Sequence, residues 1–170
     1  MVKKIFNRKI KSKFLIAEAG INHNGNLKEA FLLVDKAKES LADAIKFQTY
    51  KAEKRVKKSS PIFSILKKCE LSNEEFFKLK KYCDKKKIIF LSTPFDIKSA
   101  NFLKNIVPAF KISSGDNDNL ILLNYIKKFN KPILLSLGMI NANEIKKILK
   151  KLDIKKSKLS LLHCISEYPT

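Results

Sequence analysis

Short apolar runs alternate with amphipathic stretches along the whole sequence, and no other feature restricts the possible folds as strongly. A short apolar run between polar segments is typical of a strand buried on both faces of a sheet. Six such strands alternating with five helical patterns predict an α/β protein with a parallel sheet. The expected strands are residues 14–17, 44–47, 88–91, 109–112, 133–135 and 159–162.

Helix start signals precede the amphipathic stretches. Residues 27–40 repeat their apolar side chains at helical spacing. Ser72 with Glu75 three residues later makes a capping box, which opens a helix that we expect to reach Lys86. The other three helices are expected to start after Asp96, Asp118 and Asn141, the last with Glu144 as its capping-box partner.

One connection, residues 50–71, is unusually long and basic. We expect it to hold a single short helix at residues 62–68. Connections of this length are often functional.

Two architectures fit the alternation: a doubly wound sheet and a (β/α)₈ barrel, which needs roughly 250 residues. No Gly-x-Gly-x-x-Gly follows any predicted strand. Polar residues fall at the carboxyl ends of successive strands, and a barrel gathers such residues around one axis. We therefore expect a TIM-barrel type fold, truncated after about six βα units. The strand-end residues are Glu18, Lys46, Gln48, Ser92, Thr93, Lys111, Ser113, Ser136 and His163.

The composition fits a folded, water-exposed domain. The 170 residues are 45% hydrophobic and 31% charged, enough for one domain core, which we expect over residues 13–170. Residues 1–12 read as a basic N-terminal extension without the apolar block of a signal peptide. No stretch approaches the roughly 18 apolar residues of a membrane span. We expect a cytoplasmic protein with no membrane partner, and free thiols at its three widely spaced cysteines.

The formal net charge of +20 raises the question of nucleic acid. Of the 36 basic residues, however, only Arg8 and Arg55 are arginine, the residue whose planar fork reads bases and phosphates. Solvated lysine-rich helix faces are the favoured interpretation. Nucleic acid is not expected as a functional partner.

Lys46 and Lys111 each end an apolar strand, where a cation is costly unless it is paired or faces a cavity. An anion site is the favoured interpretation, and internal salt bridges to Glu18 or Asp96 are the alternative. A Schiff-base role for either lysine also stays open. The hydroxyl groups that would help hold a phosphate belong to Thr93, Ser114 and Ser136.

Other polar residues near strand ends have less specific patterns. Glu18 suits a sugar ligand or a general base, or a structural acceptor. His23 by itself is weak evidence for any role. His163 ends an apolar strand and lacks a second ligand nearby, so a hydrogen-bonded core histidine is favoured there over a metal ligand. One of Asp116 and Asp118 is expected to cap the following helix, which would leave Asp116 nearest the cavity.

Six segments in order resemble the N-acetylneuraminate (sialic acid) synthase family, from about residue 14 to the last residue. That resemblance implies a (β/α)₈ barrel followed by a small antifreeze-like domain. It also implies a transferase that condenses phosphoenolpyruvate with an N-acylated hexose, such as N-acetylmannosamine, to a nine-carbon keto acid and phosphate. The matching segments are residues 16–25, 43–49, 90–96, 108–116, 131–139 and 161–170.

The resemblance also implies roles for single residues. Tyr168 would lie near both substrates, Glu18 would contact the sugar, and Asp116 would manage protons. The complete enzyme would be a homodimer that uses Mn²⁺ or Mg²⁺. Its metal-binding histidines would belong to later strands, so no metal ligand is expected in this chain. Ser166 and Leu137 depart from the asparagine and threonine usual in relatives. The residues that would hold phosphoenolpyruvate are Lys46, Thr93, Lys111, Ser114, Ser136 and Tyr168.

The expected function is thus sialic acid synthase-like condensation. Because the closing strands and the antifreeze-like domain are absent from the sequence, we expect the 170-residue chain by itself to be inactive. Two alternatives stay open: a Schiff-base aldolase on the same scaffold, and a noncatalytic anion- or nucleic-acid-binding protein.

Overall fold

The computed structural model describes residues 13–155 and 158–167. The chain separates into two compact units, one formed by Lys11–Val107 and the other containing Pro108–Thr170. We call them the N-terminal unit and the C-terminal unit and describe each by itself. The extension predicted at residues 1–12 and the site residue Tyr168 lie outside the described residues.

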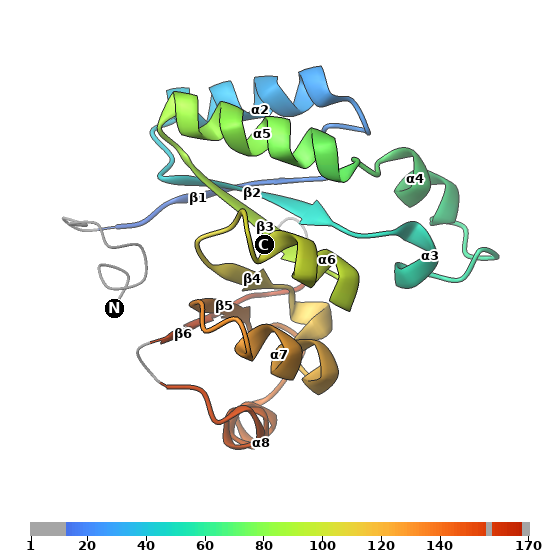
Figure 1. The fold of residues 1–170 in the computed structure, drawn as a ribbon. Coiled ribbons are helices and arrows are strands. Elements are labelled where there is room, and N and C mark those ends of the chain that lie inside the picture. The colour runs from blue at the N-terminus through green and yellow to red at the C-terminus, as the bar shows by residue number, and fades with distance from the viewer. Residues whose placement is uncertain (1–12, 156–157, 168–170) are drawn as a thin grey trace. The chain divides into compact units, whose positions relative to one another are not determined.

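A three-stranded parallel sheet, in the order β1-β2-β3, forms the centre of the N-terminal unit. Its strands are β1 (Ile16–Gly20), β2 (Ala44–Thr49) and β3 (Ile89–Pro94). Helices α2 (Leu27–Glu39) and α5 (Asn73–Lys86) lie side by side along one face of this sheet (Figure 1). The rings of Phe47 and Phe90 stack on the sheet, and His23 from the turn before α2 contacts Phe47, with ring centroids 6.0 Å apart in both pairs. The Phe47 face is therefore the face that the helices cover.

Side-chain caps fix where these helices begin, and those at Ser72 and Asp96 were predicted from the sequence. Asn26 accepts hydrogen bonds from the first turn of α2. Ser72 and Glu75 form the predicted reciprocal capping box of α5. Asp96 caps α6 (Ile97–Leu103) through the Ser99 backbone N–H. Such caps satisfy backbone donors that a helix leaves unpaired.

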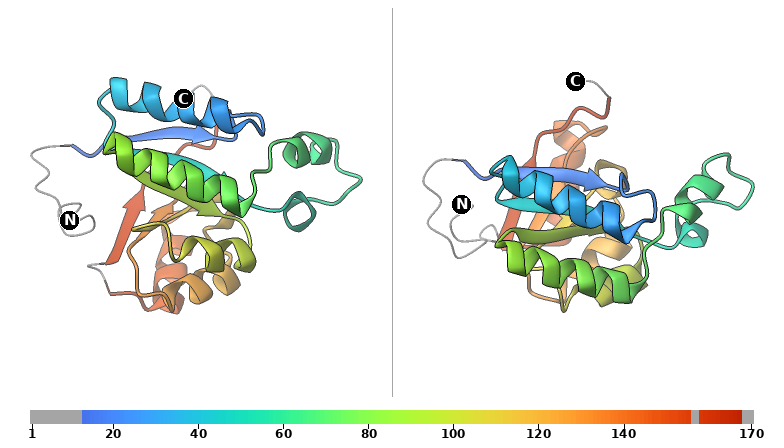
Figure 2. Two further views of the ribbon diagram at one scale, coloured as in Figure 1. Left: turned by 45° about the horizontal axis from the view of Figure 1, so that its top comes forward. Right: turned by 90° about the horizontal axis from the view of Figure 1, so that it is seen from above.

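The long connection between β2 and α5 holds two short helices, where the sequence predicted one. The predicted helix is α4 (Phe63–Lys68), and the additional one is α3 (Ala52–Arg55). A small core of Tyr50, Ala52 and Leu66 joins them. The Tyr50 hydroxyl donates to the Leu66 carbonyl at 2.9 Å, and burial raises the pKa of Tyr50 to about 12. Both helices extend away from the layer of α2 and α5 (Figure 2).

The C-terminal unit contains a second parallel sheet, in the order β4-β5-β6. Its strands are β4 (Phe110–Ile112), β5 (Ile133–Ser136) and β6 (Leu159–Leu162). A 3₁₀ turn, η1 (Ser114–Asp116), follows β4 and precedes α7 (Leu120–Lys127), which packs against α8 (Ala142–Leu152). Phe110 stacks on Phe129, just after α7, so the Phe110 face of the sheet is on the side of α7.

The predicted α/β class with parallel strands is confirmed, and two local predictions are wrong. The first strand begins at Ile16 because the backbone of Leu15 is engaged with the turn at Asp43, whose carboxylate accepts from the Leu15 N–H at 2.9 Å. Neither Asp116 nor Asp118 caps α7. Asn119 does, accepting from the Leu122 N–H at 3.1 Å.

Two further expectations concern chemistry away from the sheets. Cys69, Cys83 and Cys164 are free thiols, the first two buried. Burial raises the pKa of Cys83 to about 12, which makes its thiol unreactive at neutral pH. Among the helices of the described residues, none has the length and apolar character needed to cross a membrane.

Candidate functional site

One face of the N-terminal sheet carries polar side chains from all three strands. Residues paired in parallel register point to the same side, and alternate residues point to opposite sides. Glu18 is paired with Lys46, and Gln48 with Thr93. Phe47, between Lys46 and Gln48, lies on the face covered by α2 and α5. The four polar side chains therefore share the face turned away from those helices.

Lys46 and Glu18 form an ion pair on this face. The Lys46 Nζ lies 2.5 Å from Glu18 Oε2, with the lysine side chain 8% exposed and the carboxylate side chain 56% exposed. The salt bridge to Glu18 that the sequence offered as an alternative is thus present. The exposed carboxylate remains accessible to a ligand, whereas Asp96 is engaged in capping α6.

Thr93 is completely buried at the end of β3, and its hydroxyl has no hydrogen-bond partner among the described residues. An unpaired buried hydroxyl costs about 1–3 kcal/mol. A water molecule or a ligand oxygen that bonds to Thr93 Oγ1 would remove this cost.

Arg55 adds a second cation next to this face, and the sequence did not single it out as a site residue. Its Nη1 donates to Gln48 Oε1 at 2.8 Å. Its guanidinium lies 3.9 Å from the ring centroid of Phe95 and 4.9 Å from that of Tyr50. Its rarity was the available signal, because it is one of two arginines in a lysine-rich chain.

The C-terminal sheet has a corresponding polar face. Lys111 and Ser136 are both buried, and the Lys111 Nζ donates to Ser136 Oγ at 2.5 Å and to the Ile112 carbonyl at 3.1 Å. Register places Lys111 opposite Leu134, two residues before Ser136, so these side chains share the face opposite Phe110. These two bonds hold the ammonium at the carboxyl end of β5.

Gly138, just after β5, extends this cluster, and the sequence did not single it out. Its N–H donates to Ser114 Oγ at 3.1 Å, and its carbonyl accepts from the buried Asn117 amide at 2.9 Å. A Cβ at this position would lie 2.4 Å from Ser166 Oγ and 2.7 Å from Ser114 Oγ. A side chain at this position would have to displace these two hydroxyls, so glycine suits the loop after β5.

Asp116 is half-buried at the end of η1. Its carboxylate accepts from Ser113 Oγ at 2.8 Å and from Asn119 Nδ2 at 3.4 Å. These bonds tie the turn after β4 to the start of α7. Residues of its own turn thus hold the Asp116 carboxylate, and Ser114 belongs to the same turn.

The two histidines differ. His23 is buried, and its Nδ1 accepts from the Gly25 N–H at 3.1 Å, whereas its Nε2 has no partner among the described residues. Burial lowers the pKa of His23, and the carboxylate of Glu75 partly opposes this. His163 is exposed. His23 is therefore a hydrogen-bonded core histidine that shapes the turn before α2.

We expect the stability of the N-terminal unit to fall as the pH drops below about 6.5, the ordinary pKa of histidine. A histidine whose pKa is lowered by folding binds its proton more readily in the unfolded chain, so acid favours unfolding. Urea denaturation at pH 7.5, 6.5 and 5.5 measures the effect. His23→Gln should flatten the pH dependence, while the exposed control His163→Gln should not. Equal slopes in wild type and His23→Gln would contradict this assignment.

A metal centre does not fit the described residues. Within residues 13–155 and 158–167, no three His, Cys, Asp or Glu side chains are grouped as metal ligands would be. The divalent cation that the resemblance implies is therefore assigned to no residue here, and we derive no chemical step through it.

The two polar faces belong to different units, so the predicted convergence of Lys46 and Lys111 on one anion stays a prediction. Each face by itself offers a buried ammonium with hydroxyl groups on the same unit. Such donors suit phosphate or carboxylate oxygens. Tyr168, predicted near both substrates, lies outside the described residues.

The comparisons with known proteins point to one family. A model of the NeuB family matches residues 33–170. The chain is 46% identical over 159 residues to protein MJ1065 of Methanocaldococcus jannaschii, covering 92% of this chain and 47% of that protein. It is 39% identical over 178 residues to an N,N'-diacetyllegionaminic acid synthase of Campylobacter jejuni, covering 94% of this chain and 53% of the synthase. The chain thus spans about half the length of the curated relatives it matches.

A solved structure is similar as well. The N-acetylneuraminic acid synthetase of Leptospira borgpetersenii, determined in complex with citrate, is 40% identical and superposes with a TM-score of 0.87. The match covers 92% of this chain and 55% of the synthetase chain.

Proposed function

This chain belongs to the NeuB family, and on that basis we propose that it carries the phosphoenolpyruvate-binding part of a nonulosonic acid synthase. The reaction joins phosphoenolpyruvate to an N-acylated hexose and releases a nine-carbon keto acid and phosphate. We further propose that the six strands are consecutive strands of a (β/α)₈ barrel, as the resemblance implies.

The observation that carries the proposal is the buried Lys111–Ser136 pair. Lys111 is 6% exposed, and its ammonium donates at 2.5 Å to the hydroxyl of Ser136, which is itself buried. Burying a cation costs several kcal/mol, so a fold that keeps one at a strand end has a use for its charge. A phosphate bound there would accept from Lys111, Ser136 and Ser114. Preorganised donors of this kind contribute on the order of a few kcal/mol each when charge develops on the leaving phosphate.

The N-terminal face would supply the other end of the site. Lys46 and the unpaired Thr93 hydroxyl would bind anionic oxygens of phosphoenolpyruvate. Glu18 would turn toward the sugar, because a carboxylate next to the phosphate would repel it. Asp116, bonded to Ser113 next to Ser114, would help manage protons, as the resemblance implies.

In the proposed reaction, the methylene carbon of phosphoenolpyruvate attacks the aldehyde carbon of the open-chain sugar. Water then adds to the cationic centre, and phosphate leaves by carbon–oxygen cleavage. The residues of this chain would bind the phosphate and orient the methylene, and closing the distance between two substrates is itself a large part of such catalysis.

Phosphoenolpyruvate binding by the chain tests the proposal directly. In a ³¹P NMR titration we expect saturable binding that is tighter than that of inorganic phosphate, with pyruvate weaker still. Binding no tighter than that of inorganic phosphate would count against the proposal. Incubation with N-acetylmannosamine and Mn²⁺, followed by mass spectrometry, tests the condensation. If borohydride traps pyruvate on a lysine of the chain, the Schiff-base aldolase would replace the synthase as the proposed function.

Glu18→Gln separates the sugar role from the phosphate role. Removing the carboxylate frees the Lys46 ammonium from its 2.5 Å partner, so we expect phosphoenolpyruvate to bind two- to fivefold more tightly. That range corresponds to about 0.4–1 kcal/mol, the usual size of a half-exposed ion pair. Calorimetric titration measures the change. Weaker phosphoenolpyruvate binding in Glu18→Gln would mean that Glu18 orients Lys46 rather than competing for it.

A further inference from the structure

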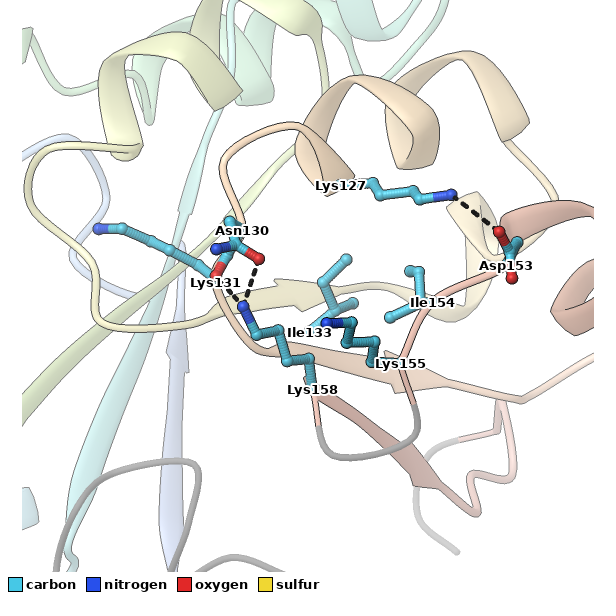
Figure 3. Close-up of a pocket in the computed structure, with 8 residues that line it drawn as sticks. All are labelled: Lys127, Asn130, Lys131, Ile133, Asp153, Ile154, Lys155 and Lys158. Atoms are coloured by element: carbon cyan, nitrogen blue, oxygen red, sulfur yellow. Dashed lines mark hydrogen bonds and ion pairs between the residues drawn. The ribbon is translucent and has the colours of Figure 1, made fainter.

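A lysine-lined hollow of about 180 Å³ lies in the C-terminal unit, formed by three segments of the chain (Figure 3). One is the end of α7, the second is the loop into β5, and the third joins α8 to β6. We call it the amino-end pocket. The residues around it are Lys127, Asn130, Lys131, Ile133, Asp153, Ile154, Lys155 and Lys158.

Position separates this pocket from the proposed phosphoenolpyruvate site. Ile133 is the first residue of β5 and Lys158 immediately precedes β6, so the pocket lies at the amino ends of these strands. Ser136 is the last residue of β5. Three residue steps along a strand span about 10 Å, too far for one compact ligand to touch both ends.

The charges around the pocket are unbalanced. Four lysines and one aspartate are among its lining residues, which gives them a net charge of +3. The carboxylate, Asp153, is 96% exposed and lies 4.0 Å from the Nζ of Lys127, so water screens this pair strongly. Lys158 instead donates to the backbone oxygen of Asn130 at 3.0 Å and to its side-chain oxygen. These neutral acceptors hold the Lys158 ammonium over the pocket without cancelling its charge.

The floor of the pocket is apolar. Ile133 is buried and Ile154 half-buried, so charges held above them are partly removed from water. Burial lowers the pKa of Lys131, the direction expected when an ammonium loses hydration. An anion bound here would interact with several ammonium groups at once.

We propose that the amino-end pocket binds a compact polyanion that carries two or more phosphate or carboxylate groups. The size of the hollow supports a compact ligand, because it is smaller than the roughly 300–1,000 Å³ of pockets for drug-sized molecules. Lysines from three segments line the hollow (Figure 3), which supports multivalent rather than single-charge recognition. The proposal does not depend on the proposed synthase function.

Calorimetric titration of the full chain with pyrophosphate, citrate and inorganic phosphate tests the proposal. We expect saturable binding of pyrophosphate or citrate that is at least tenfold tighter than that of inorganic phosphate. Pyrophosphate alone would identify the ligand class as phosphate, and citrate alone as carboxylate. The absence of saturable binding for both would overturn the proposal.

A matched pair of double variants separates a pocket from diffuse attraction to a chain of net charge +20. Lys155→Gln/Lys158→Gln removes two charges from the pocket, and Lys146→Gln/Lys147→Gln removes two from the exposed surface of α8. We expect the first to weaken polyanion binding at least tenfold and the second less than twofold. Equal losses would overturn the proposal.

Two controls cover folding and ligand identity. Because Lys158 bonds to Asn130, Lys155→Gln alone is the second variant, with an expected loss of at least threefold. No loss in that variant would overturn the proposal. The last control is a single-stranded RNA. If it binds equally well to both double variants while pyrophosphate and citrate bind to neither, the pocket proposal is overturned in favour of diffuse attraction of nucleic acid.

Discussion

Replacing Gly25 with alanine is expected to destabilise the N-terminal unit by about 2–5 kcal/mol, the largest stability effect of any substitution considered. The backbone at Gly25 has φ +75°, a left-handed conformation that costs other residues roughly 1–2 kcal/mol. An alanine Cβ would also lie 2.0 Å from the Lys68 carbonyl oxygen, a backbone atom that cannot rotate away. Overpacking of this kind costs roughly 1–3 kcal/mol more.

Thermal unfolding followed by circular dichroism measures the effect. A loss of this size lowers the Tm of a unit of this length by roughly 10 °C or more. Gly115→Ala is the matched control, since nothing lies within 4 Å of the Cβ it would add. Its free energy of unfolding should stay within about 0.5 kcal/mol of wild type. A Gly25→Ala variant that unfolds together with this control would show that the turn does not hold the end of α4.

The helix starts illustrate what a sequence can predict. The capping boxes of Ser72 with Glu75 and of Asn141 with Glu144 were predictable because both partners lie within one helical turn. Asn119 displaced Asp118 as a cap because the chain first forms the 3₁₀ turn that ends at Asp116. Such a turn has no strong sequence signal of its own.

The candidate site was predictable in its residue types but not in its contacts. Lysines at strand ends indicated an anion site because burying a cation is costly wherever it occurs. The sequence could not decide whether Lys46 forms an internal ion pair or belongs to an anion-binding site. Glu18 is 28 residues away and becomes a neighbour of Lys46 only through strand register. The contacts of Arg55 with the rings of Phe95 and Tyr50 depend on the unexpected helix α3 in the same way.

Lys111→Met is expected to weaken phosphoenolpyruvate binding about 100-fold, the largest functional effect among these variants. The substitution removes a charge-assisted hydrogen-bond donor at the proposed phosphate position, a loss of about 3 kcal/mol. Calorimetric titration measures the affinity. The control is Lys98→Met, which removes the same charge at an exposed position of α6. It should change the affinity less than about twofold, because exposed charges are screened by salt.

Stability distinguishes a binding lysine from a structural one. Lys111 is 6% exposed, and methionine of similar length fills its space without the cost of burying a cation. If Lys111 is kept for a ligand, the relief of burying a cation should offset the lost bonds to Ser136 and Ile112, so Lys111→Met should keep a Tm near that of wild type while losing phosphoenolpyruvate. A trade of this kind, with stability held or gained and function lost, is typical of charges maintained for binding. A variant that loses about 2 kcal/mol of stability and keeps its affinity would instead assign the Lys111–Ser136 bond to the fold alone.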